Sequence, residues 1–267
     1  MVNSSSSVHK TFAFLEHFTP AKSEWGVSEL ARELGISKSK VFRFFSQMQD
    51  IGILDQNPDT EKYRLGLKLF ELGNRVQLRS AFIEKTHAPL ISVSDNIKET
   101  VHIAILKNHQ VFYVDKVESP YGLKISSQIG SFNPAHATAL GKVLLAYLPS
   151  ENLTKSIKYI FGKKGATAYT SNTITQKSKL LKELKNINLK GYAIDREEFE
   201  VGLICVAIPI FNQSGEVVAS LSASGPANRF NKEELNNYVR SSNNRDRNYI
   251  YLGIDLLKQI KTKIFEI

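Results

Sequence analysis

The sequence of 267 residues predicts an α+β protein with two domains. The length suits two domains, because one domain usually takes about 100–200 residues. The N-terminal part has apolar residues at helical spacing followed by a hairpin signal, and the rest mixes strand-like runs with helical ones. Strands joined by short turns, with helices set apart from them, favour an antiparallel sheet in the second domain.

Three helices are predicted in the N-terminal domain. Apolar residues at helical spacing, stopped by Pro20, predict the first helix at about residues 7–18. Ser28 is suited to cap a short second helix that ends at Gly35, and Ser37 is suited to cap a third. The apolar positions of the third helix fall at i, i+3, i+4 and i+7: Val41, Phe44, Phe45 and Met48. A short helix, a tight turn and a longer helix are typical of a helix-turn-helix.

A β-hairpin is predicted next, because Asn57-Pro58-Asp59 is a turn signal between short apolar runs at 52–54 and 63–65. It would form the wing of a winged helix-turn-helix. The outer face of the third helix carries donors suited to phosphates and base edges. We expect the residues that contact DNA to be Ser28, Lys38, Ser39, Lys40, Phe42, Arg43 and Gln47. A three-helix interaction domain with a solvated basic face is the alternative.

A connector helix is predicted between the two domains. From residue 66 to about 90 the apolar residues recur at helical spacing: Leu67, Leu69, Phe70, Leu72, Val76, Leu78, Phe82 and Ile83. A lone helix cannot hide so many apolar side chains, so we expect a homodimer in which a second subunit covers them. The predicted divisions are 1–66 for the winged helix-turn-helix, 67–88 for the connector helix and 89–267 for the C-terminal domain.

The C-terminal domain is predicted to contain five strands and three helices. The predicted strands are residues 101–106, 111–117 and 123–129, followed by a hairpin of 203–211 and 217–224 around the turn Gln213-Ser214-Gly215. The predicted helices are at about 138–148, 174–190 and 231–263.

Composition narrows the class of protein. Hydrophobic residues make up 42% and charged residues 23%, so the chain can form an ordinary core. No apolar run reaches bilayer length and the start lacks a signal-peptide pattern, so we expect a cytoplasmic protein with no membrane contact. Cys205 is the single cysteine and cannot form an internal disulfide.

The net charge of +9 is unevenly distributed along the chain. Residues 1–85 hold 12 Lys/Arg against 10 Asp/Glu, whereas residues 151–190 hold 9 against 2. Most of the excess charge therefore lies outside the predicted DNA-binding domain. We interpret the lysine-rich stretch as a solvated helical face rather than a second nucleic-acid site.

Eight short segments, in order along nearly the whole chain, together form a recognisable pattern. They are Ser28-Glu29-Leu30-Ala31, Ser39-Lys40-Val41-Phe42-Arg43, Tyr63-Arg64-Leu65-Gly66, Glu99-Thr100-Val101, His136-Ala137-Thr138-Ala139-Leu140-Gly141-Lys142, Gly191-Tyr192-Ala193-Ile194-Asp195-Arg196-Glu197-Glu198, Gly202-Leu203-Ile204-Cys205-Val206-Ala207-Ile208-Pro209 and Ser222-Ala223-Ser224-Gly225-Pro226. With these segments the chain resembles the IclR family of bacterial regulators. The departures are Phe44-Phe45, where leucines are usual, and an unusually polar stretch at 241–249.

The resemblance implies a GAF-like C-terminal domain that binds a small effector. It also implies a dimer through the DNA-binding half, often a dimer of dimers, and control of a nearby catabolic operon. Effectors in the family are typically small organic acids, sugar-acid derivatives or aromatic compounds. The effector identity, the operator and the choice between repression and activation stay open.

An effector pocket is expected at the positions that match the family. The first N–H groups of the helix near Ala139 and Leu140 can receive a carboxylate with help from the helix dipole. By resemblance, polar contacts would come from Asp195, Ser222 and Ser224, and apolar wall from Ile125, Leu203 and Cys205. Each also has an ordinary explanation: a turn or cap residue, a solvent-facing serine, or a small buried hydrophobe.

Three other functions compete with this interpretation. An enzyme would need His136, Asp195 and Cys205 to meet, but the sequence has no nucleophile elbow, phosphate loop or paired-carboxylate motif, so we expect no catalysis. A metal sensor using His102, His136 and Cys205 is an alternative that their spacing neither supports nor excludes. A protein–protein module with a degenerate DNA domain is disfavoured by Arg43 and its lysine neighbours. We expect no cofactor.

Overall fold

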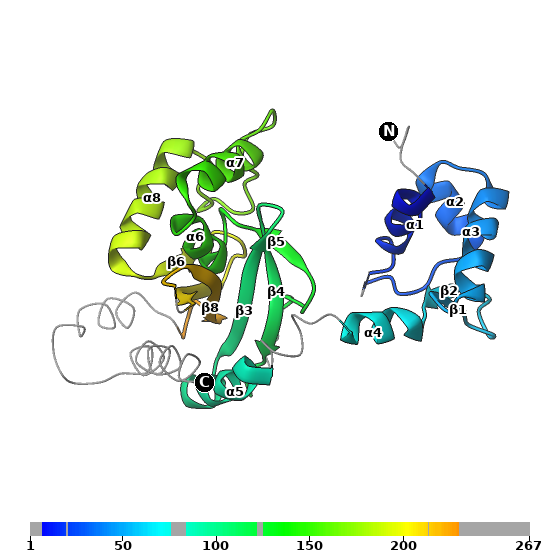
Figure 1. Ribbon diagram of the computed structural model, residues 1–267, viewed down its shortest axis with the longest axis horizontal. Helices are drawn as coiled ribbons and strands as arrows, with labels where there is room; N and C mark the ends of the chain where they lie inside the picture. Colours follow the sequence, from blue (N-terminus) through cyan, green and yellow to red (C-terminus); the bar gives the residue numbers. More distant parts are fainter. Residues whose placement is uncertain (1–6, 20, 76–83, 122–124, 213, 230–267) are drawn as a thin grey trace. The chain divides into compact units, whose positions relative to one another are not determined.

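The computed structural model describes residues 7–19, 21–75, 84–121, 125–212 and 214–229, in two compact units, Met1–Ser80 and Ala81–Ile267 (Figure 1). The predicted α+β class is confirmed. The first unit combines helices with a two-stranded sheet, and the second is built on a six-stranded antiparallel sheet. None of the helices in the described ranges is both long enough and apolar enough to cross a bilayer.

The first unit has the predicted winged helix-turn-helix arrangement. Its core includes Val41, Phe45 and Met48, three of the four apolar positions predicted for the third helix, and Phe44 packs at its edge. The Phe45 ring lies 4.6 Å from that of Tyr63, so the helix packs directly on the wing. The elements are α1 (Ser7–Leu15), α2 (Val27–Leu34), α3 (Lys38–Asp50), β1 (Leu54–Gln56), β2 (Tyr63–Leu65) and α4 (Leu67–Asn74).

The helix caps differ in part from the predicted ones. α2 begins one residue before Ser28, so Ser28 is not its cap; the Gly26 N–H instead donates to the Glu29 carboxylate at 3.4 Å. Gly35 ends this helix with a left-handed φ of 64°, as glycine permits. Ser37 does occupy the N-cap of α3, but no backbone N–H of the helix donates to its hydroxyl.

Trp25 ties the wing to the helices. Its backbone N–H and carbonyl pair with those of Tyr63 in β2, both at 2.9 Å. Its indole N–H donates to the His17 carbonyl at 2.8 Å, and the Lys22 ammonium lies 3.3 Å above the ring. The buried indole therefore joins the end of α1, the start of α2 and the wing in one cluster.

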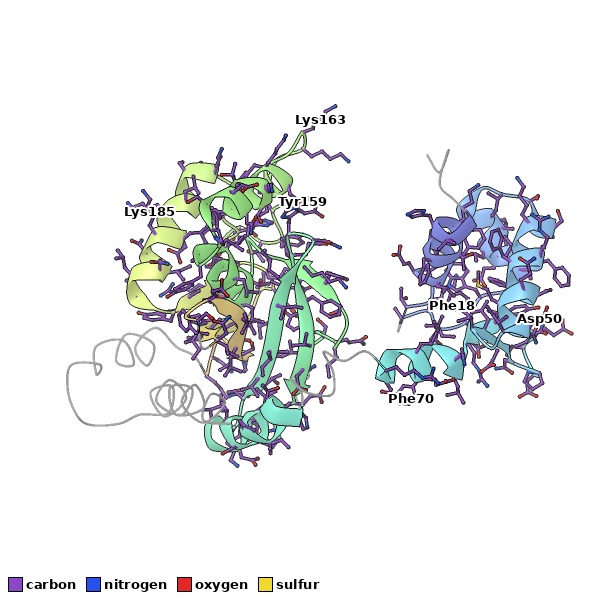
Figure 2. All side chains as sticks on the ribbon, viewed as in Figure 1. Phe18, Asp50, Phe70, Tyr159, Lys163 and Lys185 are labelled. Atoms are coloured by element: carbon purple, nitrogen blue, oxygen red, sulfur yellow. The ribbon has the colours of Figure 1, made fainter. Side chains whose placement is uncertain are left out.

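The connector range contains two helices in the described part of the chain. α4 buries none of its residues, and Leu67 and Phe70 are 79% and 63% exposed (Figure 2). Residues 76–83, which include Val76, Leu78, Phe82 and Ile83, lie outside the described residues. α5 (Glu84–Ile97) begins inside the predicted connector and continues past its predicted end.

The sheet of the second unit has the order β5-β4-β3-β8-β7-β6, with every neighbouring pair antiparallel. The strands predicted at 101–106 and 111–117 and the hairpin of 203–211 and 217–224 are confirmed. The bounds are β3 (Thr100–Lys107), β4 (Gln110–Val117), β5 (Phe132–Pro134), β6 (Ala193–Arg196), β7 (Leu203–Phe211) and β8 (Val217–Pro226).

The strand predicted at 123–129 is wrong. Residues 125–129 form no strand, and residues 122–124 lie outside the described ranges. The edge strand of the sheet is β5, a few residues later, and the opposite edge is β6, which the sequence analysis did not predict. Residue Gln213 of the predicted hairpin turn also lies outside the described residues.

Helices cover both faces of the sheet. On one face lie α6 (Ala139–Ala146), α7 (Ser150–Ile160) and α8 (Lys177–Lys190), and on the other lies α5 (Figure 1). The helices predicted at 138–148 and 174–190 correspond to α6 and α8, whereas α7 was not predicted. The helix predicted at 231–263 lies outside the described residues.

A β-bulge between Ile103 and Ala104 changes which side chains of β4 face α6. Ile103 pairs with Asp115, but the next residue, Ala104, pairs with Tyr113. Tyr113 therefore packs in the α6 core, while Asp115 faces α5. There the Asp115 carboxylate lies 2.9 Å from the ring of His87. The bulge thus delivers Tyr113 to the side of the sheet that contains the cavity described below.

Candidate functional site

The outer face of α3 is the first candidate site. All seven residues predicted to contact DNA are exposed or half-buried, six of them on α3 and Ser28 near the start of α2. Phe42 is 57% exposed although it is aromatic, and Val41 beside it is fully buried. The helix therefore separates an apolar side that packs in the core from a side of exposed donors, as a recognition helix requires.

The second candidate site is a cavity between α6 and the sheet. It has about 430 Å³ of atom-free space, part of it open to solvent. The structure brings all eight residues predicted for the effector pocket to its lining: Ile125, Ala139, Leu140, Asp195, Leu203, Cys205, Ser222 and Ser224.

The N-terminus of α6 supplies backbone donors to this cavity. The Thr138 hydroxyl accepts a hydrogen bond from the Gly141 N–H at 3.2 Å and donates to the Pro134 carbonyl at 3.0 Å. The preceding N–H groups, of Ala139 and Leu140, have no acceptor within the helix because they belong to its first turn. A carboxylate in the cavity can therefore accept from them.

Asp195, Cys205 and Ser224 form one row across three strands. Asp195 pairs with Cys205, and Cys205 pairs with Ser224, so their side chains share a face of the sheet. Burial raises the pKa of Asp195 to about 7, although its Oδ1 accepts the Glu198 N–H at 2.7 Å. Burial also raises the pKa of the Cys205 thiol. Near neutral pH, Asp195 can therefore act as either donor or acceptor toward a ligand.

His102 and Ser222 form the next row, and His102 was missed as an effector-site residue. The two are paired across β3 and β8, and both line the cavity. Burial, with a further contribution from nearby Lys116, lowers the pKa of His102 to about 3, so the ring is neutral. Its Nε2 lies 2.7 Å from the Ser127 Oγ. Its Nδ1 and the Ser222 Oγ have no hydrogen-bond partner among the described residues.

The segment 125–127 forms one wall of the cavity. The Lys116 ammonium donates to the carbonyls of Ile125 and Ser127 at 2.9 and 2.8 Å. Together with the His102–Ser127 contact, these bonds hold the segment against β3 and β4. Ile125 thus reaches the cavity as predicted, but from a strap bound by side chains and not from a strand.

The loop after β6 forms another wall. The buried Lys142 ammonium of α6 donates to the Glu198 carboxylate at 2.6 Å and to the Ile194 carbonyl at 2.7 Å. The Thr173 hydroxyl donates to the Glu198 carbonyl at 2.5 Å. These bonds fix the loop that carries Phe199 and Glu200, two further lining residues that no sequence signal indicated.

The residues weighed for catalysis and for metal binding do not come together. The His136 ring donates from Nε2 to the Thr167 carbonyl at 3.0 Å and does not line the cavity that contains Asp195 and Cys205. A thiol with a raised pKa is also a poor nucleophile. Within the described ranges, no three His, Cys, Asp or Glu side chains are close enough to hold a metal ion.

Comparison with known proteins gives matches over nearly the whole chain. A family model described as "Bacterial transcriptional regulator IclR C-terminal" matches residues 76–244, and one described as "IclR helix-turn-helix domain" matches residues 7–58. The chain is 38% identical over 237 residues to the HTH-type transcriptional regulator KdgR of Escherichia coli (strain K12), covering 89% of this chain and 88% of that protein.

Solved structures share the fold. The Thermotoga maritima IclR structure is 29% identical, with a TM-score of 0.73 over 97% of this chain and 98% of that one. A Microbacterium hydrocarbonoxydans IclR homolog, crystallised in complex with 4-hydroxybenzoate, superposes with a TM-score of 0.79 over 97% of both chains. At 21% identity, this second likeness concerns the fold alone.

Proposed function

Because the chain belongs to the IclR family of bacterial transcriptional regulators, we propose that it binds an operator through α3 and that a small carboxylic acid in the cavity controls this binding. Membership confirms the resemblance seen in the sequence. It also makes the chain a transcription regulator with a helix-turn-helix and a C-terminal effector domain, and not an enzyme.

The observation that carries the proposal is the composition of the cavity. Backbone donors at the start of α6 lie in the same lining as the Asp195 carboxyl, the Ser222 and Ser224 hydroxyls and an apolar wall that includes Leu203. Such a lining suits a small acid, because its carboxylate can accept from the amides of Ala139 and Leu140 without an arginine. Its remaining polar atoms would meet the side chains of the sheet.

The kind of acid is narrowed only in part. The Microbacterium homolog was crystallised with 4-hydroxybenzoate, an aromatic acid, which supports aromatic acids as candidates for this chain. Organic acids, sugar acids and aromatic acids are therefore the classes we propose.

Operator binding is proposed for the exposed face of α3. Lys38 and Lys40 supply charge for phosphates, and Arg43 and Gln47 supply side chains that can pair with base edges in the major groove. We propose that Ser28, at the start of α2, contacts the backbone of the duplex.

We propose that the protein forms a homodimer and that two such dimers associate. Leu67 and Phe70 of α4 are exposed apolar side chains on a helix that buries none of its residues. A second subunit is the cover that an exposed apolar helix face needs.

The effector site is tested by a thermal-shift screen of organic, sugar and aromatic acids. A ligand at 100 times its dissociation constant adds about 2.7 kcal/mol of stability, which is easily detected. Calorimetry with the best acid then compares two variants. Asp195→Ala should cost about 1–3 kcal/mol of binding free energy through lost hydrogen bonds. Leu140→Trp should abolish binding, because the larger ring fills the space over the amides.

Operator affinity provides the control for both variants. Without acid, each variant should bind a duplex selected from a random pool as tightly as the wild-type protein does, because neither residue belongs to the helix-turn-helix. An exposed aspartate of α3, changed by Asp50→Ala, should leave acid binding unaltered. Wild-type acid affinity in both cavity variants would place the effector elsewhere.

A further inference from the structure

Two polar atoms in the cavity lining are buried without a partner. The His102 Nδ1 and the Ser222 Oγ have no hydrogen bond to any described residue, and the two residues are 2% and 1% exposed. Buried polar atoms in folded proteins almost always have partners, because an unpaired one loses its bonds to water without replacement. Two such atoms in one cavity call for a common explanation.

The two atoms belong to one place on the sheet. His102 and Ser222 lie directly opposite each other on β3 and β8, so their side chains are neighbours on the face that α6 covers. They do not bond to each other. Two other polar groups of the same lining are already engaged: Ser127 lies against the Nε2 of His102, and Asn133 donates to the Tyr113 hydroxyl at 3.1 Å.

We propose that His102 and Ser222 together bind a hydroxyl group of the effector, which makes the effector a hydroxylated monocarboxylic acid. This inference rests on the proposed function, since it names the class of acid that the cavity takes. It assigns His102 as a residue that determines specificity, in addition to the positions expected from the sequence.

A hydroxyl is the group that satisfies both atoms in either tautomer of His102. If Nε2 carries the proton and donates to Ser127, the Nδ1 accepts from the ligand hydroxyl, and the Ser222 hydroxyl donates to the ligand oxygen. If Ser127 donates to Nε2, the Nδ1–H donates to the hydroxyl oxygen of the ligand. The ligand hydroxyl then donates its own hydrogen bond to the Ser222 Oγ. A ketone or carboxylate oxygen accepts only and fits one of the two cases.

Two other ligand groups fit poorly. A second carboxylate fits only the tautomer in which Nδ1 carries the proton, and it would place its charge beside a neutral imidazole, because burial and the nearby Lys116 charge hold the pKa of His102 at about 3. A hydrocarbon would leave both polar atoms unpaired. The amides of Ala139 and Leu140 belong to α6 and His102 belongs to β3, so two different elements would hold the carboxylate and the hydroxyl of the ligand.

The test uses two pairs of acids that differ by one hydroxyl: 6-hydroxyhexanoate with hexanoate, and 4-hydroxybenzoate with benzoate. Calorimetry on the full-length protein measures all four dissociation constants. In at least one pair, we expect the hydroxylated acid to bind at least about tenfold more tightly than the acid without the hydroxyl. The acid without the hydroxyl leaves the buried polar atoms of His102 and Ser222 unpaired.

Two substitutions of His102 separate the two ring nitrogens. The amide of His102→Asn places a polar atom near the position of Nδ1, and that of His102→Gln places one near the position of Nε2. We expect the Asn variant to keep the preference for the hydroxylated acid, and the Gln variant to lose about tenfold in the ratio of the two affinities. Ser222→Ala should also reduce the ratio, while affinity for the unhydroxylated acid stays near wild type in each.

The ratio of affinities is the decisive readout, because a purely structural role of His102 would weaken both members of a pair alike. Equal binding of both acids in both pairs by the wild-type protein would overturn the inference and leave the acid site standing. The inference would also be overturned if His102→Gln and Ser222→Ala both kept the wild-type ratio of affinities for the hydroxylated and unhydroxylated acids. If no acid of the thermal-shift screen stabilises the wild-type protein, the proposed acid site itself fails.

Discussion

At the scale of single residues, the buried carboxyl of Asp195 keeps the cavity polar but lowers the free energy of unfolding when it is charged. The carboxyl is 2% exposed and accepts the Glu198 N–H, but burial still raises its pKa to about 7. An acid whose pKa is higher in the folded state than in the unfolded chain stabilises the fold below its unfolded pKa. That stability is lost as the pH rises through the folded pKa.

We expect Asp195→Asn to stabilise the protein increasingly as the pH rises. The amide of this variant carries no charge to bury, so its advantage over the wild-type carboxyl should grow by about 2–3 kcal/mol between pH 5 and pH 8. Urea unfolding at both pH values measures this difference. The control Asp50→Asn, at an exposed position, should show no such growth of the stability difference with pH. If the stability difference between Asp195→Asn and wild type is the same at both pH values, Asp195 is not the titrating group.

The raised pKa of Asp195 also makes a prediction about ligand binding. A carboxylate ligand meets a neutral Asp195 below pH 7 and a charged one above it, and like charges repel. Affinity for the acid should therefore fall by roughly tenfold from pH 6 to pH 8.5 in the wild-type protein, and stay level in Asp195→Asn. Calorimetry across this range would contradict the placement of the acid next to Asp195 if both proteins behave alike.

Arg43 is the residue on which operator recognition most depends in the proposed interface. Arg43→Ala should weaken operator binding by about 1–3 kcal/mol and leave the melting temperature unchanged, because the side chain is exposed. Gel-shift titration at fixed salt measures the effect. Arg196→Ala, which removes an exposed arginine from the other unit, is the matched control and should bind as the wild type does.

The cavity residues that could be predicted from the sequence differ from His102 in the kind of signal they carry. Asp195, Cys205 and the two serines were found because they lie in segments that resemble a known family. His102 could not be found in this way, because an isolated histidine in an apolar strand carries no local signal. Its role depends on the register of β3 against β8 and on the contact between its Nε2 and Ser127. Both are features of the tertiary structure, which the local sequence does not show.

At the scale of elements, α6 depends on a glycine for its position. A Cβ at Gly141 would lie 2.3 Å from the Ala135 Cα and 2.4 Å from its carbonyl oxygen, so the helix would have to move. We expect Gly141→Ala to destabilise the protein by about 2 kcal/mol or more and to weaken acid binding, because the amides of Ala139 and Leu140 would shift with it.

Gly73→Ala is the matched control for that substitution. Gly73 is also helical, and a Cβ there meets no atom within 4 Å. Alanine should therefore stabilise the helix by about 0.5–1 kcal/mol. Thermal unfolding of both variants compares the two glycines directly, and a Gly141→Ala protein as stable as wild type would show that the contact with Ala135 is easily relaxed.

Apart from the helix α7, which was not predicted, the elements that the sequence missed or predicted wrongly are short or held by side chains. The apolar residues of 123–129 alternate as they do in a strand, but the described part of this segment is bound by Lys116 and His102 in place of a neighbouring strand. β5 has only three residues and β6 four, too few for a periodic pattern. By contrast, α3, α8 and the β7–β8 hairpin are long and regular, and periodicity was enough to place them.

At the scale of the whole molecule, the excess positive charge lies mainly on the helices of the second unit. α8 buries Leu180, Leu184 and Ile187 against the core and leaves its lysines exposed. Figure 2 labels Lys185 on this helix and Lys163 in the turn after α7. An amphipathic helix with a lysine-covered outer side needs no ligand to explain its charge. Net charge alone would have been a poor guide to the DNA-binding part of this chain.

Assembly is the remaining property of the whole molecule that the exposed helix α4 predicts. Light scattering at tens of micromolar should give at least a dimer, which would read a two-fold symmetric operator with half-sites about one helical turn, or a multiple of it, apart. Phe70→Glu should lower the measured mass, because a charge cannot be buried in the interface without a free-energy penalty. Leu189→Glu, at an 85% exposed position of α8, should not. A monomeric wild-type protein would refute this.

Trp25 gives the molecule a built-in optical reporter. It is the single tryptophan of the chain, and it lies in the cluster that joins α1, α2 and the wing. Excitation at the long-wavelength edge of the indole absorption band, where tyrosine scarcely absorbs, therefore yields emission from the DNA-binding unit alone. If the acid binds in the cavity as proposed, a change in that emission when the acid is added reports a signal that has crossed from the other unit. Fluorescence without an attached dye can thus record whether the effector signal arrives, and how fast.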